Sequence, residues 1–85
     1  MRGIVRKGDG NSHGGVVLTG SVTMLIDGSP VARKGDWVSC PMHGENVIVE
    51  GDPSFTDDGV PVAFHGHRTA CGCSLISSAP NTGIA

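Results

Sequence analysis

The apolar residues of this chain fall in short runs, separated by glycine, proline and polar residues. The runs at 16–18 and 47–49 each lead toward a glycine, and residues 74–76, Ser-Leu-Ile, are predicted as a last strand. No window repeats apolar residues at the i, i+3, i+4, i+7 spacing of a helix over three turns. Short apolar runs between turn-forming residues are typical of strands, so the pattern predicts an all-β chain.

Two Asp-Gly pairs predict β-hairpins. Asp27-Gly28 separates the run 22–26 from the returning segment 29–33, and Asp58-Gly59 lies between Phe55 and Phe64. Asp-Gly is typical of the two-residue type I′ turn, because both central residues of that turn have positive φ. After each hairpin, a Gly-Asp or Gly-His pair predicts a corner, and an aspartate there accepts hydrogen bonds from nearby backbone N–H groups.

The hairpins belong to an internal repeat. Residues 20–40 align without gaps with residues 51–71, and residues 6–9, Arg-Lys-Gly-Asp, return unchanged as residues 33–36. Extending the second alignment by four residues places His13 opposite Cys40 and Cys71. The identical pairs of the first alignment are Gly20/Gly51, Asp27/Asp58, Gly28/Gly59, Pro30/Pro61, Val31/Val62, Ala32/Ala63, Gly35/Gly66 and Cys40/Cys71.

A repeating unit of this size is too small to have its own core, so its copies must pack against one another. The simplest closed arrangement places the repeats at about 20–40 and 51–71, and a partial repeat at 4–13, around an axis of approximate threefold symmetry. We therefore predict one domain over residues 1–85, a small cone of β-hairpins, with residues 79–85 as a loosely held tail. His13, Cys40 and Cys71 then converge.

Composition limits the core and the partners. The 85 residues include 14 Gly and five Pro but only two Phe, one Trp and no Tyr, so the core is small. The net charge of −2 disfavours nucleic acid as a partner. No apolar run is long enough to span a membrane or to form a signal peptide, so we expect a cytoplasmic protein or one exported by a route that needs no cleavable signal. Three cysteines in a reducing compartment indicate metal ligands or free thiols.

Candidate metal ligands are unusually dense in this chain. Cys40 and His43 have the Cys-x-x-His spacing that reaches one ion from a tight turn, and a second pair stands at His67 and Cys71. The alternative is that the histidines lie on the surface and the cysteines are small buried hydrophobic residues. The repeat favours a structural zinc ion, with four ligands among His13, Cys40, His43, His65, His67, Cys71 and Cys73.

An enzymatic role finds little support in these residues. The chain lacks the His-Glu-x-x-His pattern of zinc proteases, and no acidic residue has the spacing of a general base. A small zinc hydrolase and an adaptor that recruits effector proteins remain the alternatives to a structural protein.

Several motifs resemble the proline-alanine-alanine-arginine (PAAR) repeat family. Residues 30–36, Pro-Val-Ala-Arg-Lys-Gly-Asp, carry the repeat itself, and residues 61–64, Pro-Val-Ala-Phe, keep its frame without the arginine. The segments at 12–15, 40–44 and 66–72 are also similar to that family. The resemblance extends from residue 1 to about residue 78.

The resemblance implies a cone with Zn²⁺ near its vertex, held by three histidines and one cysteine. His13, His43 and Cys71 match by motif, and His67 is favoured as the third histidine, while the repeat nominates Cys40 as an alternative ligand.

The resemblance also implies a function. The chain resembles a non-catalytic tip that caps and sharpens the trimeric spike of the bacterial type VI secretion system, with one cap per trimer, and that helps membrane piercing and effector delivery. Effector proteins are then further partners. We expect no toxin domain, because only about seven residues follow the last strand, and export with the spike instead of through a signal peptide.

Overall fold

The computed structural model describes residues 2–84, and their regular structure is entirely β, as predicted. Each sheet is a pair of antiparallel strands: β1 with β8, β2 with β3, β4 with β5, and β6 with β7. The strands are β1 Arg2–Ile4, β2 Leu25–Ile26, β3 Ser29–Pro30, β4 Trp37–Val38, β5 Asn46–Val47, β6 Asp52–Asp57, β7 Val60–Val62 and β8 Ala79–Ile84.

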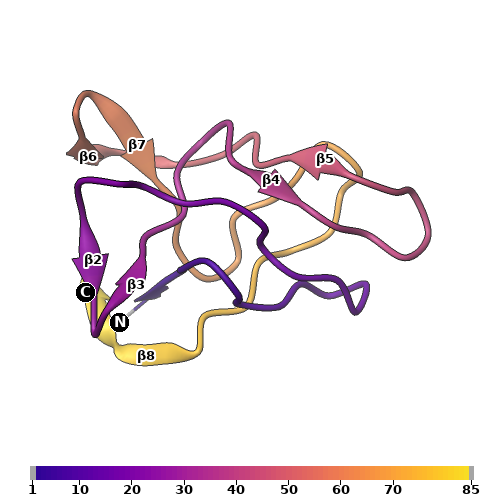
Figure 1. The fold of residues 1–85 in the computed structure, drawn as a ribbon, viewed down its shortest axis with the longest axis horizontal. Coiled ribbons are helices and arrows are strands. Elements are labelled where there is room, and N and C mark those ends of the chain that lie inside the picture. Colours follow the sequence, from indigo (N-terminus) through magenta and orange to yellow (C-terminus); the bar gives the residue numbers. More distant parts are fainter. Residues whose placement is uncertain (1, 85) are drawn as a thin grey trace.

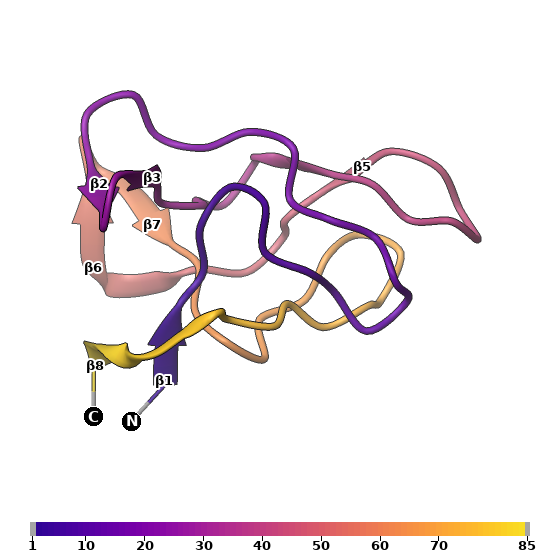
Figure 2. The same ribbon diagram turned by 60° about the horizontal axis from the view of Figure 1, so that its bottom comes forward.

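The strands gather at one end of the molecule and long loops at the other. Figures 1 and 2 show β1, β2, β3, β6, β7 and β8 together with both termini at the left, which we call the hairpin end. The loops 10–16, 39–45 and 68–74 extend to the right, and we call this the loop end.

Both predicted hairpins form with the predicted turns. Asp27 and Gly28, between β2 and β3, have φ of 51° and 81°. Asp58 and Gly59, between β6 and β7, have φ of 53° and 78°. Positive φ at both central residues defines the type I′ turn, whose twist matches that of the strands it joins.

Three backbone hydrogen bonds between repeat-equivalent residues close a ring. The Ala32 N–H donates to the Val5 carbonyl (2.8 Å), Ala63 N–H to Ala32 (2.9 Å), and Val5 N–H to Ala63 (3.1 Å). All three residues are fully buried. A cycle in which each unit donates to the previous one has threefold symmetry, so the axis expected from the repeat passes through this ring.

A second set of equivalent bonds joins each corner to an apolar run. The N–H groups of Gly8, Gly35 and Gly66 donate to the carbonyls of Val17, Ile48 and Leu75, at 2.9, 2.8 and 2.9 Å. Through these bonds, each unit places one buried apolar side chain, Val17, Ile48 or Leu75, at the axis. The core cluster there consists of Val5, Val17, Ala32, Val38, Ile48, Ala63 and Leu75.

A second apolar cluster supports the hairpin end. It consists of Ile4, Val31, Val62 and Phe64, with Met24, Ile26 and Phe55 packed against it. Phe64 stands where the two earlier units carry Arg6 and Arg33, and its ring meets Phe55 edge-on at 5.6 Å. The phenylalanine that replaces arginine at this position therefore adds apolar packing to the cluster.

Residues 79–84 form a strand where the sequence predicted a loose tail. β8 pairs antiparallel with β1, with Arg2 opposite Ile84 and Gly3 opposite Gly83. Side-chain hydrogen bonds position the preceding residues: Ser77 Oγ donates to the Ile4 carbonyl (2.6 Å), and Ser78 donates through N and Oγ to the Asp9 carboxylate. These contacts bring the chain alongside β1.

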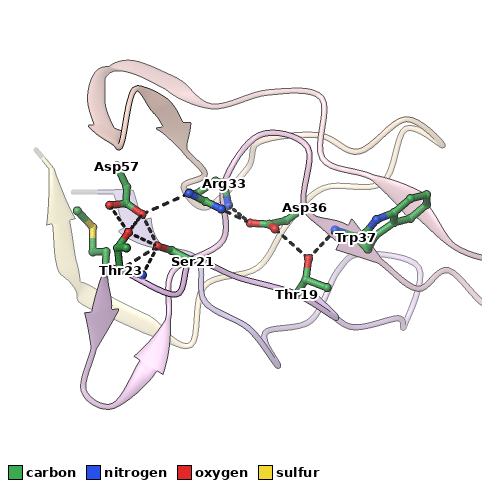
Figure 3. A network of polar contacts seen from close by, with 8 residues as sticks. Thr19, Ser21, Thr23, Arg33, Asp36, Trp37 and Asp57 are labelled. Atoms are coloured by element: carbon green, nitrogen blue, oxygen red, sulfur yellow. Dashed lines mark hydrogen bonds and ion pairs between the residues drawn. The ribbon is translucent and has the colours of Figure 1, made fainter.

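Asp57 links the two hairpins through a partly buried polar network, shown in Figure 3. Its carboxylate accepts hydrogen bonds from Ser21 Oγ and from Thr23 Oγ1, and lies 3.5 Å from the Arg33 guanidinium. The Ser21 hydrogen bond, followed by that of Thr23 and the charge of Arg33, outweighs burial and holds the pKa of Asp57 below its ordinary 3.8. The ionised carboxylate therefore stabilises the folded state.

The lowered pKa predicts how stability depends on pH. The contribution of Asp57 is complete above the ordinary pKa of 3.8 and is lost as the pH falls through the lower folded value. Asp57→Asn therefore lowers the melting temperature at neutral pH, and its deficit against the wild type shrinks only below about pH 4. Asp58→Asn, at the exposed neighbouring position, serves as the control in thermal unfolding. A deficit unchanged between neutral pH and pH 2 contradicts this assignment.

The repeat-conserved glycines Gly20 and Gly51 lie against the prolines of their own hairpins. A Cβ on Gly51 would meet the Pro61 side chain at 2.7 Å and its carbonyl oxygen at 2.8 Å. Gly51→Ala is therefore expected to destabilise the fold by about 1–3 kcal/mol through overpacking. Gly59→Asn is the control, because a Cβ at Gly59 meets no atom within 4 Å and asparagine tolerates positive φ. Urea unfolding measures both, and equal stability of Gly51→Ala and wild type contradicts the close contact.

Candidate metal centre

Four metal-ligating side chains converge at the loop end. His13, Cys40, His43 and Cys71 each present one ligand atom, and these atoms all lie within 4.8 Å of one another. His13 comes from the loop 10–16, Cys40 and His43 from the loop between β4 and β5, and Cys71 from the loop 68–74. One site thus joins all three repeat units.

Three of the distances between donor atoms are close to those of a tetrahedral zinc shell. The Nδ1 atom of His13 lies 3.3 Å from Cys40 Sγ and 4.0 Å from Cys71 Sγ, and Cys40 Sγ lies 3.5 Å from His43 Nδ1. Zinc–ligand distances of about 2.0–2.3 Å place tetrahedral nitrogen and sulfur donors about 3.5 Å apart. Two imidazoles and two thiols are also a usual zinc donor set. The residues present therefore fit a zinc ion.

Backbone hydrogen bonds shape the three loops. The bridges between Gly10 and Val16 and between Arg68 and Ser74 close the first and third loops. In the second loop, Cys40 N–H donates to the Gly44 carbonyl (3.0 Å) and Gly44 N–H donates to the Cys40 carbonyl (2.7 Å). This tight turn brings Cys40 and the exposed His43 to the same side.

Side-chain hydrogen bonds also hold the first loop at the site. Asn11 Oδ1 accepts from the N–H groups of His13 (3.1 Å) and Gly15 (3.0 Å), while its Nδ2 donates to the Ser39 carbonyl (2.9 Å). Asn11 is buried. This amide therefore joins the His13 loop to the segment that leads into Cys40.

The surroundings of Cys71 favour its thiolate. The hydroxyl of Thr69, 3.3 Å from Cys71 Sγ, and the backbone N–H of Cys73 lower the pKa of Cys71 to about 5. Burial instead raises the pKa of Cys73. Because the thiolate is the form that binds metal, Cys71 is available as a ligand at neutral pH.

His67 lies outside this group, although the family resemblance favoured it as a ligand. Its Nδ1 accepts a hydrogen bond from Phe64 N–H (2.9 Å), and its ring meets the Phe64 ring edge-on at 6.2 Å. In the earlier units, Asp9 and Asp36 accept the equivalent bonds from Arg6 N–H (2.9 Å) and Arg33 N–H (2.7 Å). His67 thus replaces an aspartate as the acceptor in a corner.

The remaining candidates also lie outside the group of four. His65 Nδ1 accepts a hydrogen bond from Ser77 N–H (3.1 Å). Cys73 is fully buried, with its Sγ 3.5 Å from Cys71 Sγ and 2.9 Å from Thr69 Oγ1.

The fold and the cluster define a class of protein: a small all-β cone with pseudo-threefold symmetry and a His/Cys site near its vertex. The sequence profile of the PAAR motif family matches residues 7–77, which is most of the chain. The chain belongs to the PAAR motif family, whose members are spike tips of type VI secretion systems and are generally non-catalytic. No curated protein matches the chain. Residues 2–84 contain no helix long and apolar enough to cross a membrane.

One pair of variants distinguishes Cys40 from His67 as the metal ligand. Cys40→Ala removes a donor of the group and is expected to lower zinc binding well below about one equivalent per chain. His67→Asp restores the corner residue of the other two units and is expected to retain about one equivalent. Metal analysis of both purified variants measures this. Loss of zinc from His67→Asp with full retention by Cys40→Ala contradicts the assignment.

Proposed function

We propose that His13, Cys40, His43 and Cys71 hold a structural zinc ion. The support is the mutual spacing of their donor atoms, with Cys40 in the place for which the resemblance favoured His67. The bound ion supplies positive charge that ties three loops together. Four protein donors complete a tetrahedral shell, whereas a catalytic zinc keeps one position open for water or substrate. The proposed site is therefore structural, and the chain is not an enzyme.

We further propose that the chain is a single domain that caps the trimeric spike of a type VI secretion system, one cap per trimer. The observation that carries this proposal is the ring of hydrogen bonds through Val5, Ala32 and Ala63. A monomer with a threefold axis presents three similar edges, so it matches the end of a trimer without a symmetry mismatch. Its hairpin end, where six strands gather, is the face that meets the spike.

In this role the cap covers the strand ends of the spike and gives it a narrow point. Unpaired strand edges pair readily with other chains, so covering them prevents aggregation. The loop end then leads during membrane piercing, and the protein leaves the cytoplasm together with the spike. Effector proteins delivered with the spike are the remaining proposed partners.

Complex formation tests this role. Mixing the purified chain with the trimeric spike protein at micromolar concentration is expected to give a complex of one cap and three spike chains. Light scattering after size-exclusion chromatography measures the stoichiometry. No complex, or three caps per trimer, contradicts the proposal.

The orientation of the cap is tested by a pair of charged substitutions. Leu25 is 56% exposed in β2 at the hairpin end, and Met42 is 71% exposed in the loop between β4 and β5. Leu25→Glu is expected to weaken the complex about 10-fold or more, because it places a charge in an apolar contact. Met42→Glu is the control and is expected to bind like wild type. Equal loss in both variants argues against docking through the hairpin end.

Removal of the metal is expected to destabilise the domain strongly. Metal binding to a site that exists only in the folded chain adds its binding free energy to the stability. We compare the protein at a zinc concentration about 1,000-fold above the dissociation constant with the same protein after chelation. Chelation removes the stabilisation by zinc, so the melting temperature is expected to fall by about 15 °C or more. His43→Ala is expected to melt near the chelated protein whether or not chelator is present. A shift of only a degree or two in the wild type contradicts a structural metal.

A further inference from the structure

A third thiol lies beside the metal site without belonging to its four donors. Cys73 Sγ is 3.5 Å from Cys71 Sγ, and Cys73 is fully buried. The Thr69 hydroxyl contacts both sulfurs, at 3.3 Å to Cys71 and 2.9 Å to Cys73. The repeat does not require this cysteine, because the earlier units have Gly15 and Met42 two residues after His13 and Cys40.

The local backbone turns the two side chains toward each other. Gly72, between the cysteines, has φ of 88°, and its N–H donates to the Thr69 carbonyl (2.9 Å). Thr69 N–H donates in turn to the Cys73 carbonyl (3.0 Å), which closes a tight loop. With Gly72 in this left-handed conformation, the Sγ atoms of Cys71 and Cys73 lie 3.5 Å apart.

We propose that Cys71 and Cys73 form a peroxide-sensitive dithiol that releases the metal on oxidation. This inference goes beyond the proposed capping role and rests on the proposed metal site only for the release step. Cys71 is half-buried, so a small oxidant in solution can reach its sulfur. Cys73 is buried and lies next to it.

The chemistry balances with hydrogen peroxide as the oxidant. The Cys71 thiolate attacks one peroxide oxygen, the O–O bond breaks, and hydroxide leaves with the formation of Cys71 Sγ–OH. Cys73 Sγ then gives up its proton and attacks Cys71 Sγ, forming the S–S bond and displacing a second hydroxide. The two thiols lose two electrons, the peroxide gains two, and the products after protonation are the disulfide and two waters. Cys71 is then no longer the thiolate that binds the metal.

Cys40 is the competing partner, since its sulfur also lies within 4.8 Å of that of Cys71. It is a donor in the proposed site, so the metal holds it as a thiolate in a fixed position. Cys73 is not a donor and is held against Cys71 by Thr69. The geometry therefore favours Cys73.

Peroxide treatment followed by mass spectrometry tests the proposal. Cleavage after Arg68 separates Cys40 from the peptide 69–85, which contains both Cys71 and Cys73. The expected product is the peptide 69–85 lighter by about 2 Da, with zinc release that dithiothreitol and added zinc reverse. A disulfide joining this peptide to the one containing Cys40, or a sulfinic acid as the first product, overturns the inference.

Two variants serve as controls, because Cys73 is buried and one substitution alone could unfold the chain. Cys73→Ser keeps a hydrogen-bonding group near Thr69, and Cys73→Ala keeps an apolar one. Both are expected to bind zinc before oxidation and to give sulfinic acid at Cys71 afterwards, with zinc release that dithiothreitol no longer reverses. If either variant that folds and binds zinc still recovers its metal like wild type, the inference is wrong. Zinc content before oxidation measures the proposed metal site by itself. A failure of the metal-site proposal can therefore be distinguished from a failure of the dithiol proposal.

Discussion

The ring of backbone hydrogen bonds through Val5, Ala32 and Ala63 is the constraint on which the rest of the structure depends. It fixes three chain segments at the same height around one axis, although they are far apart in the sequence. The side chains at these positions, one valine and two alanines, are fully buried. Every other threefold feature, from the corner glycines to the ligand loops, extends outward from this ring.

The ring also explains how so small a core specifies one structure. The buried apolar residues at the axis are valines, alanines, one isoleucine and one leucine, and they bury little area per residue. The corners add directional bonds in place of apolar area: Asp9, Asp36 and His67 each accept a backbone N–H three residues earlier in the chain. The proposed zinc ion ties the three loops at the far end, where isolated bridges close the first and third loops and the β4–β5 pair closes the second.

Much of this arrangement could be predicted from local sequence. The hairpins follow from Asp-Gly pairs, since the required positive φ is a property of two adjacent residues. The axis and the convergence of His13, Cys40 and Cys71 follow from the repeat, because equivalent residues occupy equivalent places around it. The sequence does not indicate the structural part played by the one exception, His67. Its departure from aspartate suggested a new role, whereas its Nδ1 accepts the same bond as the aspartates.

The strand β8 and the contact between Cys71 and Cys73 could not be predicted from the sequence and became visible only in the three-dimensional structure. β8 depends on Ser77 and Ser78 meeting Ile4 and the Asp9 carboxylate, which are about seventy residues away and leave no pattern in the sequence. The sulfur pair depends on the left-handed Gly72 and on Thr69, whose roles appear only once the loop is closed. Contacts between side chains of distant segments are the part of a structure that periodicity does not encode.

The central claim is that Cys40, the repeat equivalent of His13 and Cys71, completes the metal ligands together with His43, and that His67 does not. X-ray absorption at the zinc edge of the purified protein measures the donor atoms directly. We expect a shell of two sulfurs at about 2.3 Å and two nitrogens at about 2.0–2.1 Å, from Cys40, Cys71, His13 and His43. A shell of one sulfur and three nitrogens would contradict it, because that set requires His67 in place of Cys40.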